Sequence, residues 1–183
     1  LRDDFVSENN LNKNTIIFGA IGRYRKQKNY INLIKMLSKY NKINNNFICV
    51  LVGYGLDNNN EYIVELIKKN KLGNQIKLYG QTDNIHQIMN IIDLNILYSN
   101  YGEGFPNVIA ESMLCGTPTI AHDVGDAKNI VNVDGWIVEN NNMEMFLKKI
   151  SEATYIFYNN KNYWVKLKNR CRERILSNFK IDN

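Results

Sequence analysis

Four cations lie close together in the first third of the sequence: Arg23, Arg25, Lys26 and Lys28. No acid occurs between residues 9 and 56 to neutralise them. Such a cluster attracts an anion, whether a phosphate, a nucleic acid or a membrane surface. The alternative is a solvated loop and helix face, which is the stronger explanation for a second basic stretch over 161–174.

Two acids lie in a segment that has no other charged residue. Glu103 and Glu111 are the only charged residues between Leu94 and Ala121, so we expect this segment to be mostly buried. A carboxylate in apolar surroundings is costly unless it accepts hydrogen bonds or serves a ligand. Glu103 as a helix cap and Glu111 as a buried hydrogen-bond acceptor are the structural alternatives to a ligand site.

The elements that must position these residues alternate between short apolar runs and amphipathic stretches, which is typical of βα units on a parallel sheet. Gly116 is placed to end a nearly uncharged helix in the left-handed conformation. The sequence therefore predicts an α/β fold with one doubly wound, Rossmann-like parallel sheet. The predicted strands are 15–21, 47–52, 76–79, 94–98, 118–121 and 136–138, and the predicted helices are 30–40, 61–69, 84–90, 107–115, 142–158 and 161–179.

Ligands of such sheets bind at the carboxyl ends of the strands. Three segments are expected there: the loop after the first strand, the turn with Gly53 and Gly55 after the second, and residues 102–107 before the uncharged helix. The amino end of that helix offers N–H donors and a positive dipole to an anion, and Arg23 and Lys28 can face the same anion. This convergence predicts a phosphate or diphosphate site.

Five motifs in order resemble one family. Over about residues 16 to 138, the chain resembles the C-terminal, donor-binding domain of retaining nucleotide-sugar glycosyltransferases of the two-Rossmann-domain (GT-B) fold, family 4 or group 1 type. The motifs are Ile21-Gly22-Arg23 followed by Lys28, Leu51-Val52-Gly53-Tyr54-Gly55, Leu78-Tyr79-Gly80, Glu103-Gly104-Phe105-Pro106-Asn107-Val108-Ile109-Ala110-Glu111, and Gly116-Thr117-Pro118.

The resemblance implies roles for individual residues. Arg23, Lys28 and Glu103 would be catalytic: the two cations grip the diphosphate and stabilise the leaving group without a metal, and Glu103 holds the transferred sugar. Glu111 would accept hydrogen bonds from the ribose, and the segment 80–83 would line the base. Pro106 has no N–H to donate. The implied donor-binding set is Gly22, Arg23, Lys28, Gly53, Gly80, Gln81, Glu103, Gly104, Phe105, Pro106, Asn107, Val108 and Glu111.

The implied organisation is a linker over 1–14 from an N-terminal acceptor domain, a donor-binding domain over 15–160 and a C-terminal helical tail over 161–183. The implied reaction is transfer of a hexose or N-acetylhexosamine from a nucleotide sugar, UDP-linked rather than GDP-linked, to a polysaccharide or glycolipid acceptor. We expect the isolated domain to be inactive, with no further cofactor. Because sugar nucleotides are cytosolic, the enzyme is expected in the cytoplasm, with peripheral association at the inner membrane surface. Asp126 departs from the family, which often has a second glycine after the position of Gly125.

Other functions fit less well. A non-catalytic nucleotide-binding or partner-docking Rossmann module is the main alternative. A nicotinamide-dependent oxidoreductase would need Gly-x-Gly-x-x-Gly after the first strand and an acid about 20 residues later, whereas no acid follows until Asp57. No Asp-x-Asp is present to hold a divalent cation. Three scattered cysteines and two histidines argue against a metal centre. Nucleic acid is not an expected partner, because aromatic side chains are not interleaved with the bases as stacking platforms.

Overall fold

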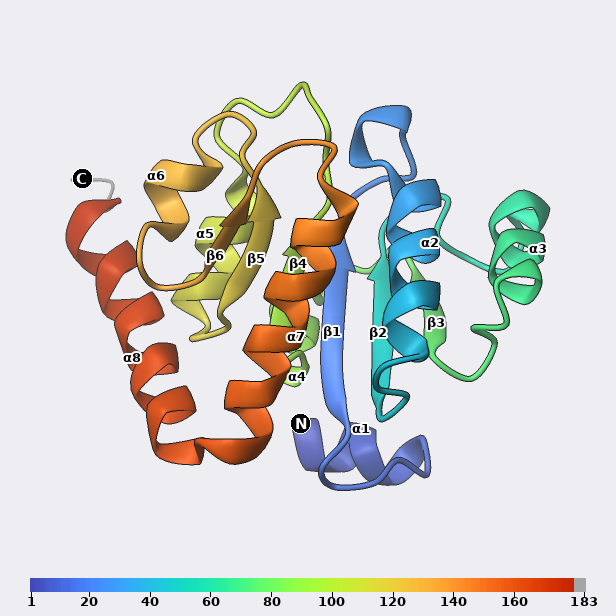
Figure 1. The fold of residues 1–183 in the computed structure, drawn as a ribbon, viewed down its shortest axis with the longest axis horizontal. Helices are drawn as coiled ribbons and strands as arrows, with labels where there is room; N and C mark the ends of the chain where they lie inside the picture. Colours follow the sequence, from blue (N-terminus) through green and yellow to red (C-terminus); the bar gives the residue numbers. More distant parts are fainter. Residues whose placement is uncertain (180–183) are drawn as a thin grey trace.

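Six parallel strands form one sheet at the centre of the computed structural model, which describes residues 1–179 (Figure 1). The strand order is β3-β2-β1-β4-β5-β6. This doubly wound order confirms the predicted α/β, Rossmann-like class. The strands are β1 (Ile16–Ile21), β2 (Phe47–Val52), β3 (Ile76–Gly80), β4 (Leu94–Leu97), β5 (Thr119–His122) and β6 (Trp136–Val138).

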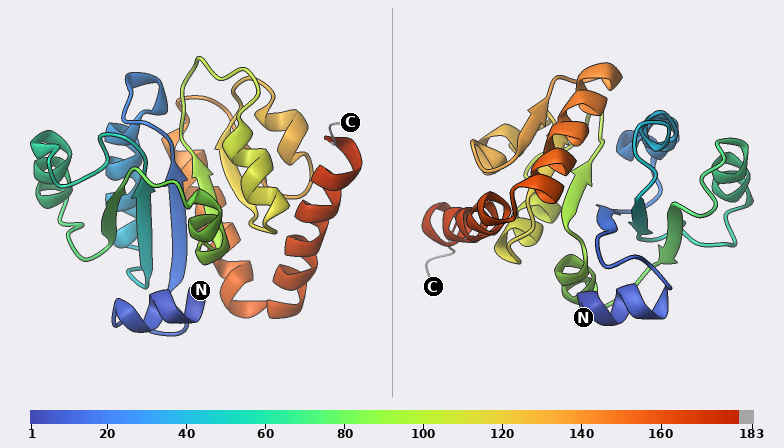
Figure 2. Two further views of the ribbon diagram at one scale, coloured as in Figure 1. Left: turned by 180° about the vertical axis from the view of Figure 1, so that it is seen from behind. Right: turned by 60° about the horizontal axis from the view of Figure 1, so that its bottom comes forward.

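Helices cover both faces of the sheet. In Figure 1, α2 (Tyr30–Asn41) and α7 (Met143–Asn159) lie in front of it. Figure 2, seen from behind, shows α4 (Ile85–Ile91) and α5 (Asn107–Leu114) on the other face. The remaining helices are α1 (Arg2–Glu8), α3 (Glu61–Lys69), α6 (Ala127–Val131), α8 (Lys161–Asn178) and the short 3₁₀ turn η1 (Lys26–Lys28).

Both faces of the central strands are therefore buried. In β1, Phe18 packs into the larger apolar core with α2, whereas its neighbour Ile17 packs into a second core with α4. Neither side chain is exposed to solvent. A strand covered on both faces reads as a continuous apolar run rather than an alternating one. This is why β1 and β2 could be located from the sequence.

The predicted elements agree closely with the structure. β2, α3 and β6 have the predicted bounds, and each other predicted strand or helix begins and ends within one residue of its prediction. Gly116 ends α5 with a φ of +76°, the predicted left-handed conformation. The last residues of the predicted tail, 180–183, lie outside the described residues. Among the described helices, none is both long and apolar enough to cross a bilayer.

Two short helices, α1 and α6, have no predicted counterpart. The apolar residues Phe5 and Val6 of α1 are adjacent and do not show the helical spacing of Ile85, Ile88 and Met89 that marks the equally short α4, and α6 is shorter still, with five residues. α1 lies at the amino ends of the strands and buries Phe5 and Val6 beside α4 (Figure 1). The assignment of 1–14 as a linker to a second domain stays a prediction.

Arg2 anchors α1 through a buried acid. Its guanidinium donates to both carboxylate oxygens of Asp93 at 2.9 Å and to the carbonyl oxygen of Thr15 at 2.9 Å. The backbone N–H of Ile17 donates to the same carboxylate at 2.9 Å. Since the Asp93 side chain is only 6 % exposed, its charge depends on these partners.

We expect Arg2→Leu to lower the free energy of unfolding by about 2 kcal/mol, because it leaves a buried carboxylate without its cation. Urea denaturation measures the change. Asp4→Asn is the control, since the Asp4 side chain on the same helix is 76 % exposed and should be replaceable at little cost. Equal destabilisation by both substitutions would contradict the role given to the Arg2–Asp93 pair.

Candidate functional site

Three glycines bring the carboxyl ends of β1, β2 and β3 into contact. The N–H of Gly22 donates to the carbonyl oxygen of Val52 at 2.8 Å, and that of Gly53 to the carbonyl oxygen of Gly80 at 2.8 Å. Gly53 has a φ of +140°, and a Cβ there would lie 2.6 Å from the carbonyl carbon of Gly22. Only glycine fits this close approach without backbone movement. The predicted donor-binding positions 22, 53 and 80 therefore lie side by side.

A cavity of about 300 Å³ opens where these strand ends meet. It includes four residues of the predicted donor-binding set: Gly22, Arg23, Gly53 and Gln81. The Arg23 side chain is exposed and makes no ion pair within residues 1–179. The complete lining is Ile21, Gly22, Arg23, Val52, Gly53, Tyr54, Gln81, Thr82 and Ile85.

Lys28 reaches from the β1–α2 loop to Glu103. The ammonium nitrogen lies 2.8 Å from Oε1 of Glu103, and the side chains are 17 % and 10 % exposed. The hydroxyl of Ser99 donates to the same oxygen at 2.7 Å. The stem of Lys28 passes over Gly22, where a Cβ would lie 3.0 Å from Cε of the lysine. A cation and an acid predicted as catalytic thus form one partly buried pair.

The β4–α5 loop that carries Glu103 is held by its neighbours. The N–H of Asn100 donates to the carbonyl oxygen of Gln27 at 3.0 Å, and the side-chain amide of Asn29 donates to Oδ1 of Asn100 at 2.8 Å. On the other side, the N–H of Asp126 donates to the carbonyl oxygen of Gly104 at 2.9 Å. Asp126 contributes only backbone here, so its departure from the family's glycine leaves this contact intact.

The amino end of α5 follows that loop. No side chain caps the helix, so Glu103 as a helix cap is wrong. Among the predicted donor-binding residues, Gly104, Phe105 and Asn107 are exposed, Val108 is half-buried and Pro106 is buried. The Phe105 ring lies against Phe179, with 5.7 Å between centroids. An uncapped helix end next to Glu103 offers N–H donors to an anion.

Glu111 is not the buried hydrogen-bond acceptor that the sequence offered as a structural alternative. It is exposed on α5, and its carboxylate makes no hydrogen bond or ion pair with any described residue. Glu111 as a buried hydrogen-bond acceptor is therefore wrong. An exposed carboxylate is available to a ligand, and its role toward a ribose stays a prediction.

His122, a residue that no sequence pattern singled out, contacts the backbone of the loop that carries Glu103. It is fully buried, between the rings of Tyr98 and Phe146 at 4.3 and 5.1 Å. Its Nδ1 lies 3.1 Å from the carbonyl oxygen of Ser99, the residue whose hydroxyl holds Glu103. Burial lowers the pKa of His122, which keeps the ring neutral. The sequence shows a histidine at the end of an apolar strand but not what it contacts.

A lowered pKa makes stability depend on pH. The unfolded chain, with a histidine pKa near 6.5, binds the proton more readily than the folded protein, so stability falls as pH decreases through that value. We expect His122→Gln to flatten the decline of the urea midpoint between about pH 7.5 and pH 5.5. His86→Gln, at an exposed position on α4, should keep the wild-type slope. Identical slopes in all three proteins would contradict this.

The described part of the chain contains no group of three or more His, Cys, Asp or Glu residues placed to hold a metal ion. The charged groups at the strand ends include the exposed Arg23 and the Lys28–Glu103 pair. Together with the uncapped end of α5, this arrangement can bind an anionic ligand that also presents hydroxyl groups to an acid.

Residues 2–173 match the family described as glycosyl transferases group 1. A glycosyltransferase from Rickettsia africae is 26 % identical and superposes with a TM-score of 0.84 over 97 % of this chain and 47 % of its own. HepE from Anabaena, solved with UDP and glucose, is 21 % identical, with a TM-score of 0.80 over 97 % of this chain and 47 % of its own.

An isolated domain has also been solved. The C-terminal domain of LpcC, a group 1 family protein of Francisella tularensis, is 19 % identical, with a TM-score of 0.78 over 100 % of this chain and 94 % of its own. The chain therefore spans about half the length of the Rickettsia and Anabaena proteins and nearly all of this single domain.

Proposed function

The chain belongs to the glycosyl transferases group 1 family, and on that premise we propose that it is the donor-binding half of a retaining, metal-independent glycosyltransferase. The transferred group is a hexose or N-acetylhexosamine, and the acceptor is a polysaccharide or glycolipid bound mainly by an N-terminal domain. On this view the isolated domain binds the donor but does not turn it over.

The proposal rests on one observation: the carboxyl ends of three strands, each with a glycine, lie beside two cations of the β1–α2 loop. Arg23 lines the cavity between these ends, and Lys28 lies over Gly22, which lines the same cavity. A nucleoside diphosphate carries its charge on the bridge between nucleoside and sugar. Two cations on that bridge would stabilise the negative charge that grows on the leaving group as the glycosidic bond breaks.

The acids and the helix end would then hold the sugar and the ribose. Glu103 is next to Lys28, so a donor whose phosphate contacts Lys28 would present its sugar hydroxyls to Glu103. Glu111, exposed further along α5, would accept from the ribose, and the N–H groups at the start of α5 would contact sugar and phosphate. Gln81 and Thr82, which follow β3 and line the cavity, would line the base.

Uridine is the proposed base, and the Anabaena structure with UDP and glucose supports this choice. UDP-sugars are made in the cytosol, so we propose a cytoplasmic site, with the complete enzyme associating peripherally with the inner membrane surface where a glycolipid acceptor is presented.

Calorimetry tests the proposal directly. We expect UDP to bind the 183-residue chain with equal affinity in the presence of magnesium and of EDTA, and more tightly than GDP. Loss of UDP binding in EDTA would overturn the metal-independent mechanism. Binding of UDP without glycosyl transfer by the complete protein would instead favour the non-catalytic nucleotide-binding module.

A further inference from the structure

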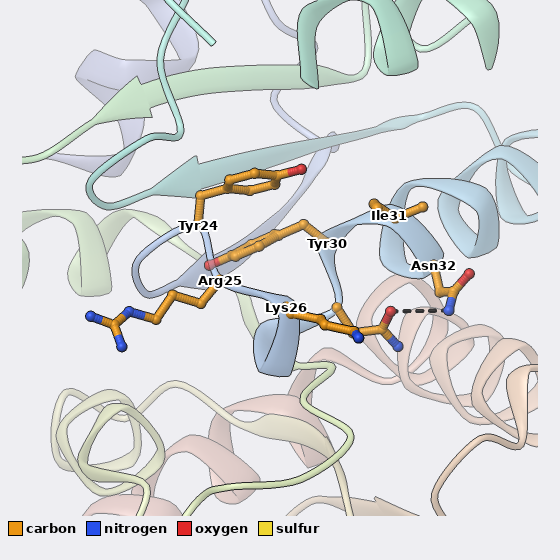
Figure 3. A pocket seen from close by; sticks show the side chains of 7 residues that line it. Tyr24, Arg25, Lys26, Tyr30, Ile31 and Asn32 are labelled. Atoms are coloured by element: carbon orange, nitrogen blue, oxygen red, sulfur yellow. Dashed lines mark hydrogen bonds between the residues drawn. The ribbon is translucent and has the colours of Figure 1, made fainter. Parts of the chain in front are cut away.

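A second cavity, of about 380 Å³, lies along the β1–α2 loop, and Figure 3 shows its side chains. It shares no lining residue with the cavity that contains Arg23. One loop thus carries two separate pockets. The second pocket, called here the α2 pocket, is lined by Tyr24, Arg25, Lys26, Asn29, Tyr30, Ile31 and Asn32.

Two stacked tyrosines form a fixed wall of the α2 pocket. The rings of Tyr24 and Tyr30 lie with centroids 6.2 Å apart and planes inclined by 29° (Figure 3). Tyr30 is 3 % exposed, and its hydroxyl donates to the carbonyl oxygen of Gly22 at 2.8 Å. Burial raises the pKa of Tyr30, so this hydroxyl remains a donor. Tyr24 is half-buried and also lines the pocket.

Two cations of the pocket have no partner in the protein. Arg25 and Lys26 are exposed, and their side chains form no ion pair or hydrogen bond among the described residues. No acid lines the pocket, and none occurs between residues 9 and 56. The local charge is therefore positive and uncompensated, which favours an anionic ligand.

Amide groups complete the lining. Asn29 donates to Oδ1 of Asn100 at 2.8 Å. It also accepts from Nδ2 of Asn32 at 3.0 Å, the bond drawn as a dashed line in Figure 3, and the two bonds orient both amides. Oδ1 of Asn32 accepts no hydrogen bond from the described residues, so it can accept one from a ligand hydroxyl.

We propose that the α2 pocket binds an acidic sugar unit, a pyranose that carries a carboxylate or a phosphate. The Tyr24 ring would pack on the apolar C–H face of the pyranose, Asn32 would bond its hydroxyls, and Arg25 and Lys26 would pair with its anion. In assigning this sugar to the acceptor glycan, the inference rests on the proposed function. An oligonucleotide fits less well, because Tyr24 and Tyr30 stack on each other and leave no platform for successive bases.

The position of the pocket suits an acceptor. Its wall residue Tyr30 is hydrogen-bonded to Gly22, a lining residue of the donor cavity. Lys26 and Lys28, two residues apart on η1, serve the α2 pocket and the Glu103 pair respectively. An acidic sugar held here would lie beside the donor site, and the pocket would select for charged acceptors.

NMR titration of the 183-residue chain tests this inference with four probes: methyl glucuronide, glucose 6-phosphate, methyl glucoside and inorganic phosphate. We expect the two acidic sugars to give saturable shifts of the amide signals of residues 24–32. Methyl glucoside lacks the anion and inorganic phosphate lacks the sugar ring, so each should bind about fivefold more weakly. The tighter of the two acidic sugars identifies carboxylate or phosphate as the native anion.

Matched variants separate the pocket from general charge. Lys26→Ala should weaken methyl glucuronide about fivefold, whereas Lys35→Ala, which removes an exposed cation of α2 outside the pocket, should leave its affinity unchanged. Equal weakening by both variants would overturn the inference, as would equal affinity for inorganic phosphate or tighter binding of a short oligonucleotide at the same residues.

A parallel titration with UDP keeps the two proposals apart. UDP should shift the signals of Gly22, Gly53 and Gln81. A chain that binds UDP but no acidic sugar would overturn the α2 pocket alone. A chain that binds acidic sugars but not UDP would support the pocket and overturn the donor site.

Discussion

Gly53→Ala is expected to lower the free energy of unfolding by about 3 kcal/mol and to weaken UDP binding by at least about tenfold. Gly53 has a φ of +140°, which L side chains rarely adopt, and a Cβ there would collide with the backbone of Gly22. The loop that begins at Gly22 and carries Arg23 must move to relieve the collision. Because both glycines and Arg23 line one cavity, its shape changes with the backbone.

Gly73→Ala is the matched control for this substitution. Gly73 does not have the positive φ of Gly53, and a Cβ there would meet no atom within 4 Å. Urea denaturation and UDP calorimetry on both variants measure the two effects. If Gly53→Ala were as stable as Gly73→Ala and bound UDP normally, the close approach of the β1 and β2 ends would not shape the site.

Lys28→Met is expected to weaken the binding of UDP by about 100-fold and to leave the binding of uridine unchanged. The Lys28 side chain is only 17 % exposed, so the contacts of its ammonium group with an anion would be partly desolvated and strong. Calorimetry with UDP and uridine separates the phosphate contribution from that of the nucleoside. Equal losses for the two ligands would contradict a role for Lys28 at the diphosphate.

Glu103→Gln should have the opposite effect and strengthen the binding of UDP. Lys28 is paired with Glu103 at 2.8 Å, so a diphosphate that binds Lys28 would have to compete with this carboxylate. Glutamine retains an oxygen that can accept from the Ser99 hydroxyl but removes the negative charge. We therefore expect UDP to bind about fivefold more tightly to Glu103→Gln, although sugar transfer by the complete protein falls steeply.

The double variant tests the coupling. In Lys28→Met, the further change Glu103→Gln should alter UDP affinity much less than it does in the wild-type background, because the ion pair is already absent. If Glu103→Gln raised UDP affinity equally in both backgrounds, its effect would arise from general repulsion and not from competition for Lys28.

The local sequence determined most of the fold. The strand β2 and the helices α3 and α5 were located because their apolar patterns and end signals lie within short windows, as does the glycine that ends α5. The order of the motifs indicated the family, and the match over residues 2–173 confirms it. The helix α1 was missed because its apolar residues do not recur at helical spacing, whereas those of the equally short α4 do, and α6 was missed because it has only five residues.

The tertiary structure decided which side chains meet. The sequence predicted Lys28 and Glu103 for one site but not their direct pairing. It did not predict that His122 contacts the carbonyl oxygen of Ser99 or that Arg2 binds Asp93. It also left open whether Glu111 is buried or exposed. These contacts exist because the strand order brings β4 next to β1 and β5 next to β4. Hydrophobic period and turn chemistry are properties of neighbouring residues, whereas strand order and register set the distances between loops far apart in the chain.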